Sequence, residues 1–381
     1  MLFSPWVLMK QAAKYLLNSW DLEEGDIVLT SGHGLISWLI RKFTRCNFSH
    51  AAIYVGNGSL LESTNRYSFS KNIQRLVFKE PNMVAVLRVN NGLSVPEKKA
   101  LVNFMRSKVG ARYSVPRAVS SVLGSIGRWV RKVLGEGIPH FLSGSQYCSH
   151  YVAEGYANIG IELTEKGIDC SPGDLFRSNK LMRLKNIIHV ASPRELEILA
   201  KKDYVSENKK RMSRWLTKTR LLGIGLGVYI SDINDVRQFL LRHRKLDRVV
   251  VGWILSSKYH STYRNDLTQN PCRYFRDALM GLGLPNNELK CFAMFEWNIG
   301  CKNADRHLEE YLKASRLYGE SGLIYDRLQR LIYRGLVLQT LTSLEMLYPL
   351  LLHLKIGGAN FRGIINMFRQ MLQIGDMLAD Q

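Results

Sequence analysis

The sequence predicts an α+β protein in which a small antiparallel sheet with packed helices is followed by a mostly α-helical C-terminal domain. Three observations support this fold class. The chain has 381 residues, about two and a half times the roughly 150 residues of a single domain. Short β-type runs alternate with turns over residues 21–90. The second half of the chain instead carries apolar residues at helical spacing.

The predicted strands are short runs rich in Val, Ile and Tyr. They are Asp26–Thr30, Ser49–Val55, Ser59–Thr64 and Val84–Val89. After them, Ser94-Val95-Pro96-Glu97 has the form of a capping box, so we expect a helix to begin near Pro96. A second helix is predicted to begin near Cys148 and to run to Asn158, with Gly160 as its stop.

Four segments are expected along the chain: a lead-in over 1–20, a folded domain over 21–190, a basic linker over 191–220 and a helical domain over 221–381. Residues 201–220 carry eight basic and two acidic side chains, which is typical of a solvated linker or a boundary helix. Helical spacing in the last segment is shown by two sets of apolar residues. These sets are Ile324, Leu328, Leu331 and Ile332, and then Ile364, Phe368, Met371 and Leu372.

The composition excludes fibrous and largely disordered proteins, because 46% of the residues are hydrophobic and 22% are charged. The 53 Lys and Arg residues exceed the 32 Asp and Glu residues and give a net charge of +21. This charge favours anionic partners such as nucleic acid, anionic lipid or acidic polymers, without choosing among them. Six cysteines without paired spacing indicate reduced thiols rather than a disulfide scaffold.

We expect a cytoplasmic protein, with a peripheral membrane location as the alternative. The apolar run Pro5–Met9 is shorter than a secretory signal requires. A membrane-spanning helix needs about 18 or more consecutive apolar residues. Leu221–Ile230 is too short, and Leu336–Leu354 is interrupted by Glu345 and Pro349, so no span is predicted.

The segment Lys98–Gly135 is both basic and amphipathic. It contains nine Lys or Arg residues and no Asp or Glu, together with apolar residues at helical spacing such as Val122, Ile126 and Trp129. One interpretation is a surface helix that packs on its own sheet. The other is a lid that faces the substrate or an anionic membrane.

A hairpin that contains His50 and Glu62 is the first candidate for chemistry. If Gly56-Asn57-Gly58 forms a three-residue loop, Glu62 pairs with Ala52 across the two strands. His50 and Glu62 then share one face as diagonal neighbours, about 7–8 Å apart at the backbone. A two-residue loop would place them on opposite faces, so the pairing depends on the register.

The second candidate is Cys148, which follows a Gly144-Ser145 turn at the predicted start of a helix. The positive end of the helix dipole favours the thiolate, which is the nucleophilic form. The backbone N–H of Cys148 at such a helix start would also help to stabilise an oxyanion. A neighbouring imidazole could accept the thiol proton, and a carboxylate such as that of Glu62 could fix its tautomer.

Four ordered motifs carry a resemblance to a known family. They are Gly25-Asp26-Ile27-Val28; Ser49-His50 leading to Tyr54-Val55-Gly56 and Glu62; Tyr147-Cys148-Ser149; and Ser171-Pro172-Gly173-Asp174-Leu175. Over about residues 20–185, the sequence resembles the YiiX/YebB-like branch of the permuted NlpC-type papain-like cysteine hydrolases. The resemblance implies a permuted papain-like fold for 21–190, with Cys148 as nucleophile, His50 as general base and Glu62 as the residue that orients His50.

One position departs from that pattern. Related sequences tend to have Glu or another residue where this chain has His150. The lecithin:retinol acyltransferase group has a Cys-x-His arrangement, so acyl-lipid chemistry stays open. His150 lies about 200° around a helix from Cys148, and we give it no catalytic role.

The predicted function is hydrolysis of amide or ester bonds through a thioester on Cys148, as in an amidase or peptidase. The substrate would be an amide- or ester-containing molecule such as a peptidoglycan peptide or an acyl lipid. One alternative is an acyl-lipid hydrolase or acyltransferase at membranes, with residues 98–135 on the anionic surface. Another is a non-catalytic basic protein that binds an anionic membrane or, less favoured, nucleic acid.

No cofactor or metal is expected. The candidate ligands Cys272, Cys291, Cys301 and His307 lack the short two-to-four spacing of structural zinc sites. Asp26 and Asp174 are expected to cap turns rather than to take part in catalysis.

Overall fold

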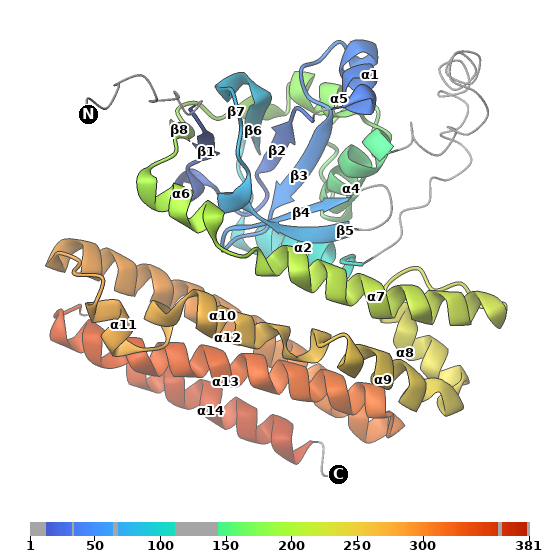
Figure 1. The fold of residues 1–381 in the computed structure, drawn as a ribbon, viewed down its shortest axis with the longest axis vertical. Coiled ribbons are helices and arrows are strands. Elements are labelled where there is room, and N and C mark those ends of the chain that lie inside the picture. The colour runs from blue at the N-terminus through green and yellow to red at the C-terminus, as the bar shows by residue number, and fades with distance from the viewer. Residues whose placement is uncertain (1–12, 33, 64–67, 111–143, 357–359, 379–381) are drawn as a thin grey trace, which may run out of the picture. The chain divides into compact units, whose positions relative to one another are not determined.

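The computed structural model describes residues 13–32, 34–63, 68–110, 144–356 and 360–378. It confirms an α+β protein with a small antiparallel sheet and a mostly helical C-terminal region (Figure 1). The chain divides into two compact units. The first comprises residues 1–209 with 231–233, and the second comprises 210–230 with 234–381.

The main sheet of the first unit has six strands in the order β5-β4-β3-β2-β6-β7, and all neighbouring strands are antiparallel. Its strands are β2 (Ile27–Thr30), β3 (His50–Tyr54), β4 (Ser59–Ser63), β5 (Ser68–Asn72), β6 (Val84–Val89) and β7 (Leu181–Arg183). The four predicted runs correspond to β2, β3, β4 and β6. The sequence analysis missed β5 and β7.

The predicted lead-in segment is wrong at its C-terminal end. Tyr15–Leu17 forms strand β1, which pairs with β8 (Ile188–Val190) in a separate two-stranded sheet. Leu16 and Leu17 are buried. Such three-residue strands are too short to show alternation, and their partners lie far along the chain, so pairing rather than local pattern defines them.

The first unit contains several helices, of which some begin at a side-chain capping box and others do not. They are α1 (Leu35–Thr44), α2 (Val95–Ser107), α4 (Gly144–Asn158), α5 (Pro172–Arg177) and α6 (Pro193–Ala200). Ser94 and Glu97 form the predicted capping box of α2, and Ser171 and Asp174 form one at α5. Of the basic segment Lys98–Gly135, residues 98–107 belong to α2, whereas residues 111–135 lie outside the described part of the chain.

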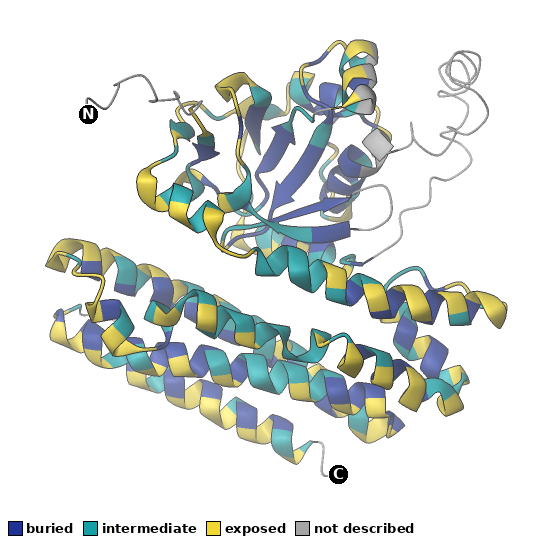
Figure 2. Cartoon of the chain, viewed as in Figure 1, coloured by how far each residue is buried: buried dark blue, intermediate teal, exposed yellow. Residues whose placement is uncertain are grey.

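Two apolar layers lie on the two faces of the main sheet, and the central strands β2 and β3 are buried (Figure 2). On one face, alternate residues such as Leu29 and Ile53 pack with α2 and α4. The intervening residues, such as Val28 and Ala52, form the other layer. Gly155 allows α2 and α4 to approach closely, since a Cβ atom there would lie 2.3 Å from the Met105 sulfur.

The second unit is helical in its described residues. Its helices are α7 (Tyr204–Gly225, which begins in the first unit), α8 (Ile233–Arg242), α9 (Asp247–Ser256), α10 (Asn265–Gln269), α11 (Arg276–Met280), α12 (Asn286–Ser321), α13 (Ile324–His353) and α14 (Phe361–Met377). Trp297, Tyr311, Leu344 and Phe368 lie in the core between α12, α13 and α14. The predicted linker over 191–220 is therefore largely helical, as α6 and α7.

One described helix, α13, is long and apolar enough by length and composition to cross a membrane. Its best 18-residue window has a mean hydropathy of 1.3, and 33% of that window is buried within the protein. Pro349 lies inside this helix. A core helix of this length passes the same criterion, so the finding is weak support for a span.

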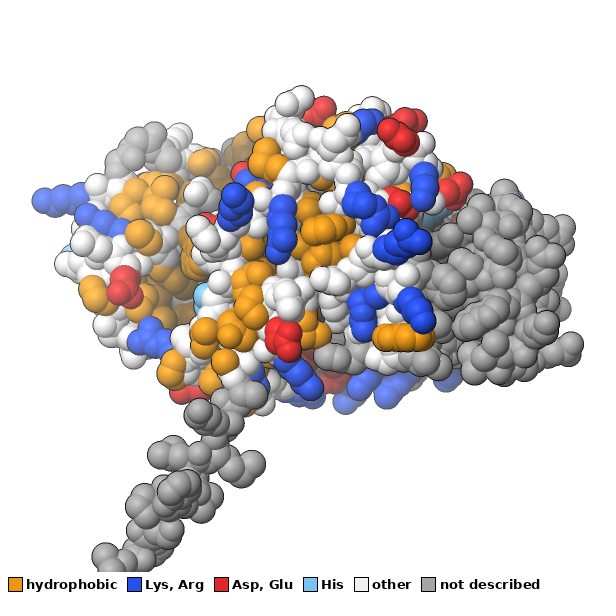
Figure 3. Space-filling model, turned by 90° about the horizontal axis from the view of Figure 1, so that it is seen from above, with side chains coloured by type: hydrophobic (Ala, Val, Ile, Leu, Met, Phe, Trp, Pro, Cys, Tyr) orange, Lys and Arg blue, Asp and Glu red, His pale blue; other side chains and the backbone are white. Residues whose placement is uncertain are grey.

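Basic side chains are spread over the surface. The face shown in Figure 3 has Lys and Arg side chains scattered among apolar groups rather than gathered in one patch. On this face, the excess positive charge is therefore not concentrated in a single stripe.

Candidate functional site

The hairpin of β3 and β4 has the predicted register. Ala52 pairs with Glu62, and Tyr54 pairs with Leu60. The loop between them is Gly56-Asn57-Gly58, in which all three residues have positive φ angles of 84°, 53° and 69°. Two glycines and an asparagine are the residues that adopt this backbone at least cost. The three-residue loop thus places His50 and Glu62 on one face of the hairpin, as predicted.

His50 and Glu62 are in direct contact. The Nε2 atom of His50 lies 3.0 Å from the Oε2 atom of Glu62. The Glu62 side chain is 11% exposed and the His50 side chain 26% exposed. Because His50 is the first residue of β3, its ring lies at the end of that strand.

Cys148 completes a chain of three polar side chains. It lies on α4, is fully buried, and its sulfur hydrogen-bonds to the His50 ring. Since Nε2 of His50 is engaged by Glu62, Nδ1 is the ring nitrogen left for the sulfur. Cys148 lies far from the hairpin in the sequence and on a different element, and the fold thus brings it to the pair that the hairpin creates.

The predicted helix start at Cys148 is wrong. α4 begins at Gly144 and ends at Asn158 as expected. Cys148 is therefore the fifth helical residue, where an α-helix directs the backbone N–H to the carbonyl four residues earlier. The dipole effect weakens beyond the first turn. Neither the helix dipole nor the Cys148 N–H as an oxyanion donor then supports the site, and His50 is the basic group that interacts with Cys148.

The three groups form a coupled ionic set. Burial opposes a charge on the His50 ring, but the Cys148 sulfur and the Glu62 carboxylate outweigh it and raise the pKa of His50 from 6.5 to about 10. Burial likewise opposes ionisation of Glu62, but the His50 hydrogen bond and charge, with help from Lys71 and Lys209, lower its pKa to about 2. Both shifts favour a protonated His50 ring beside an ionised Glu62.

Two lysines near Glu62 were not found by sequence reasoning. The Nζ atom of Lys71, on β5, lies 3.7 Å from Glu62 Oε2. Lys209, at the end of the first unit, lies 4.3 Å above the centre of the Phe69 ring, and burial lowers its pKa. In the register of β4 and β5, Phe69 lies opposite Glu62 and Lys71 opposite Leu60, so a correct prediction of β5 would have revealed Lys71. Nothing in the sequence signals Lys209.

The remaining candidates have structural contacts. Nδ1 of His150 lies 3.8 Å from the Asp169 carboxylate. Asp26 accepts a hydrogen bond from the Glu23 N–H at 2.8 Å, and Asp174 closes its capping box. Burial raises the pKa of the Cys170 thiol to about 12, which makes it a poor nucleophile. Within the described residues, no group of three or more His, Cys, Asp or Glu side chains could hold a metal ion.

The ionic set predicts a specific pH dependence of stability. The folded-state pKa of His50 is about 10, above its ordinary 6.5, so its contribution is complete below pH 6.5 and is lost as the pH rises toward 10. The folded-state pKa of Glu62 is about 2, below its ordinary 4.5, so its contribution is present above pH 4.5 and is lost as the pH falls toward 2.

This dependence can be measured by hydrogen exchange of the β3 and β4 amides as a function of pH. We expect Glu62→Gln to remove the loss of stability at acid pH and to move the loss at alkaline pH to lower pH, because the protonated His50 ring loses its carboxylate partner. A Glu62→Gln profile that overlays the wild type would contradict the ionic coupling.

Comparisons with known proteins add little to this geometry. No family model and no curated protein matches the chain. Among solved structures, the chain is similar to an Escherichia coli O157:H7 protein described as the metalloprotein YiiX. The two share 18% identity with a TM-score of 0.31, over 46% of this chain and 100% of that chain. A TM-score this low carries no argument about fold or activity.

Proposed function

We propose that the first unit is a permuted papain-like cysteine hydrolase that cleaves amide or ester bonds. The observation that carries the proposal is the continuous contact from Cys148 through His50 to Glu62, in which Nε2 of His50 lies 3.0 Å from Glu62. A nucleophile, a base within its reach and a third group that orients the base are the parts that covalent acyl transfer requires. The order His, acid, Cys along the chain agrees with the resemblance to the permuted family.

In the proposed reaction, the Cys148 thiolate attacks the carbonyl carbon, and the C=O electron pair moves to oxygen. The tetrahedral intermediate collapses, the bond to the leaving amine or alcohol breaks, and His50 supplies the proton that this group needs. A thioester with Cys148 remains. Water then attacks the thioester, His50 accepts its proton, and release of the acid restores the thiolate beside the imidazolium.

The role of Glu62 follows from its position. Its carboxylate holds Nε2 of His50, so that Nδ1 faces the sulfur, and it stabilises the charged ring. His50, with help from Lys71 and Lys209, keeps the pKa of Glu62 at about 2 and so keeps this carboxylate ionised at any pH at which the enzyme would act. Glu62→Gln should therefore reduce turnover less than Cys148→Ala, because an amide can still orient the ring while lacking the charge.

The test is the rate at which iodoacetamide alkylates individual cysteines of the full chain, followed by mass spectrometry. We expect His50→Ala to slow alkylation of Cys148 at neutral pH by about tenfold or more, because an unassisted thiol is only slightly ionised there. Exposed Cys291 is the internal control, and its rate should not change. If His50→Ala leaves the Cys148 rate unchanged, His50 is a structural residue and the proposed mechanism fails.

The substrate class is proposed to be an acyl compound with an amide or ester link, as in a peptide, a peptidoglycan peptide or an acyl lipid. The chemistry of the three residues is the same for each of these. Incubation of the wild type with amide, ester and phospholipid substrates separates them, and detection of transfer to an added alcohol or amine would separate an acyltransferase from a hydrolase.

A further inference from the structure

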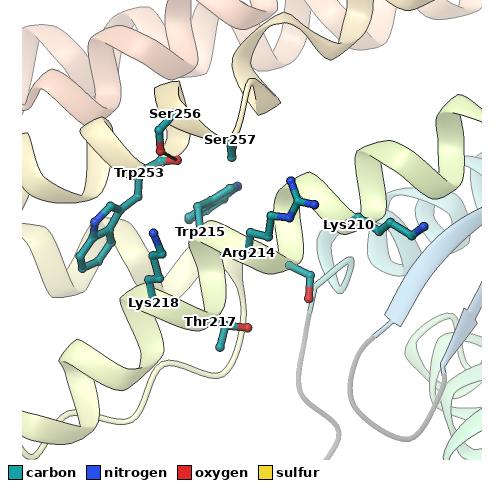
Figure 4. A pocket seen from close by; sticks show the side chains of 9 residues that line it. Lys210, Arg214, Trp215, Thr217, Lys218, Trp253, Ser256 and Ser257 are labelled. Atoms are coloured by element: carbon teal, nitrogen blue, oxygen red, sulfur yellow. Dashed lines mark hydrogen bonds between the residues drawn. The ribbon is translucent and has the colours of Figure 1, made fainter.

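The second unit contains a cavity of about 580 Å³ that has no part in the proposed hydrolase site. It lies between α7 and the C-terminal end of α9 (Figure 4). Lys210, Arg214 and Lys218 line it from α7, and Trp253 and Ser257 line it from the region of α9. Lysine, arginine, indole and hydroxyl groups are all hydrogen-bond donors, so the lining is suited to an anion.

The positive charge at this cavity is not balanced locally. Lys210, Arg214 and Lys218 are spaced at i, i+4 and i+8 and therefore share one face of α7. From Lys209 to Arg220 the chain has six basic residues and no acidic one. No acidic side chain among the described residues lines the cavity. Like charges at this spacing repel each other, and a bound anion would relieve that repulsion.

A buried donor on the cavity lining also lacks a partner. Trp215 is 1% exposed, and its indole Nε1 has no hydrogen-bond acceptor among the described residues. Figure 4 shows the nitrogen edge of this indole turned toward Arg214 and Ser257. An unsatisfied buried donor is unusual and costly. An oxygen of a bound anion, or a water that it holds in place, would satisfy the indole.

The face of α7 that carries these cations continues into an exposed apolar end. With 100° between successive residues, Leu221 lies about 20° from both Lys210 and Arg214 around the helix, and Ile224 lies about 40° from Lys210 and about 80° from Arg214. Leu221 is 64% exposed and Ile224 57% exposed, and Leu226 and Tyr229 just beyond them are also exposed. Contiguous exposed apolar residues beside a positive site are typical of a surface that binds membranes.

We propose that the second unit binds an anionic phospholipid surface, with the headgroup phosphate in the cavity between α7 and α9 and the apolar end of α7 at the acyl boundary. A free phosphate would neutralise the cations but would leave Leu221 and Ile224 in water. A lipid headgroup accounts for both features at once, because its phosphate and its acyl chains lie side by side. This surface is distinct from the basic segment 98–135 and independent of the proposed hydrolase activity.

The experiment is co-sedimentation of the full chain with vesicles of phosphatidylcholine alone, or of phosphatidylcholine with phosphatidylserine or with a phosphatidylinositol phosphate. We expect binding to the anionic vesicles only, and a decrease of about tenfold or more in the partition coefficient for K210Q/R214Q/K218Q. The matched control is K245Q/K290Q/R327Q, which removes three exposed basic residues of the same unit that do not line the cavity and should bind as the wild type.

A second variant tests the apolar end. L221Q/I224Q keeps every charge, and both positions are exposed, so folding should be unaffected. We expect it to lose vesicle binding while it retains binding of inorganic phosphate, measured by calorimetry. The wild type should bind inorganic phosphate more tightly than K210Q/R214Q/K218Q does.

Three results would overturn the proposal. Equal binding to phosphatidylcholine alone would exclude headgroup recognition. Phosphate binding without vesicle binding would assign the cavity to a free phosphate compound. Loss of vesicle binding in R128Q/R131Q/K132Q, with full binding in K210Q/R214Q/K218Q, would place the membrane surface in the basic segment instead.

Discussion

Replacing Cys148 by alanine should abolish turnover of whichever amide or ester substrate the wild type cleaves. We expect kcat/KM to fall by about 10⁴-fold or more, because no other group can form the thioester and the loss of a nucleophile removes most of the catalytic effect. Cys148→Ser should be nearly as inactive, since a hydroxyl beside the imidazolium of His50 stays protonated. The measurement is single-substrate kinetics on the substrate that the panel of amides, esters and phospholipids identifies.

Cys170→Ala is the matched control for this result. Cys170 is fully buried in the same apolar layer as Cys148, so both alanine variants lose a sulfur atom from one core. Cys148 interacts with His50, whereas the Cys170 sulfur lies near the Ser149 carbonyl, so Cys170→Ala should stay within a few-fold of the wild type. Turnover that survives in Cys148→Ala, or that is lost equally in both variants, would show that packing rather than nucleophilic attack explains the effect.

The contact between His50 and Glu62 was predictable because it depends on local sequence. The loop Gly56-Asn57-Gly58 sets the register of one hairpin. Because side chains alternate between the two faces along each strand, this register decides which residues share a face. No contact between distant parts of the chain is needed to decide which face the two side chains share. The capping box at Ser94 and Glu97 was predictable for the same reason.

The missing parts of the site depend on distant contacts or on weak local signals. Lys209 is 140 residues further along the chain than Phe69, yet its ammonium group lies over the Phe69 ring and its charge lowers the pKa of Glu62. No sequence spacing predicts a contact over that distance along the chain. β5, which carries Lys71, alternates serine with larger residues and has no continuous apolar face. The start of α4 was placed too late because Gly144 and Ser145 are typical of a turn, yet both are helical in the folded protein.

The role of Asp26 shows how tertiary structure adds to a local prediction. A turn-capping role for Asp26 was expected and agrees with its contact to the Glu23 N–H, but the Arg88 partner was not expected. Nε and Nη2 of Arg88 lie 2.7 Å from Oδ1 and Oδ2 of Asp26, and Nη1 lies 2.6 Å from Glu23. Asp26 is only 1% exposed. This bidentate pair joins the start of β2 to β6, the neighbouring strand of the central sheet.

Arg88→Met should therefore destabilise the first unit by about 3–5 kcal/mol, because it leaves the Asp26 carboxylate buried without its partner. The methionine retains much of the apolar volume of the arginine stem, so the loss of stability reports mainly on the removal of the guanidinium charge. Hydrogen exchange of the β2 and β6 amides in the full chain measures the effect on this unit, and the α13 amides, in the second unit, should exchange as in the wild type.

Two further variants separate a buried charge from a general loss of contacts. Arg177→Met removes an arginine that lies 3.4 Å from Asp174 in an exposed pair, and it should cost about 1 kcal/mol or less. The double variant Arg88→Met with Asp26→Asn should be more stable than Arg88→Met alone, because the amide can still accept the Glu23 N–H while no unpaired charge is buried. If the double variant is instead less stable than Arg88→Met, the arginine acts through packing, and the ion pair contributes little to the stability of the sheet.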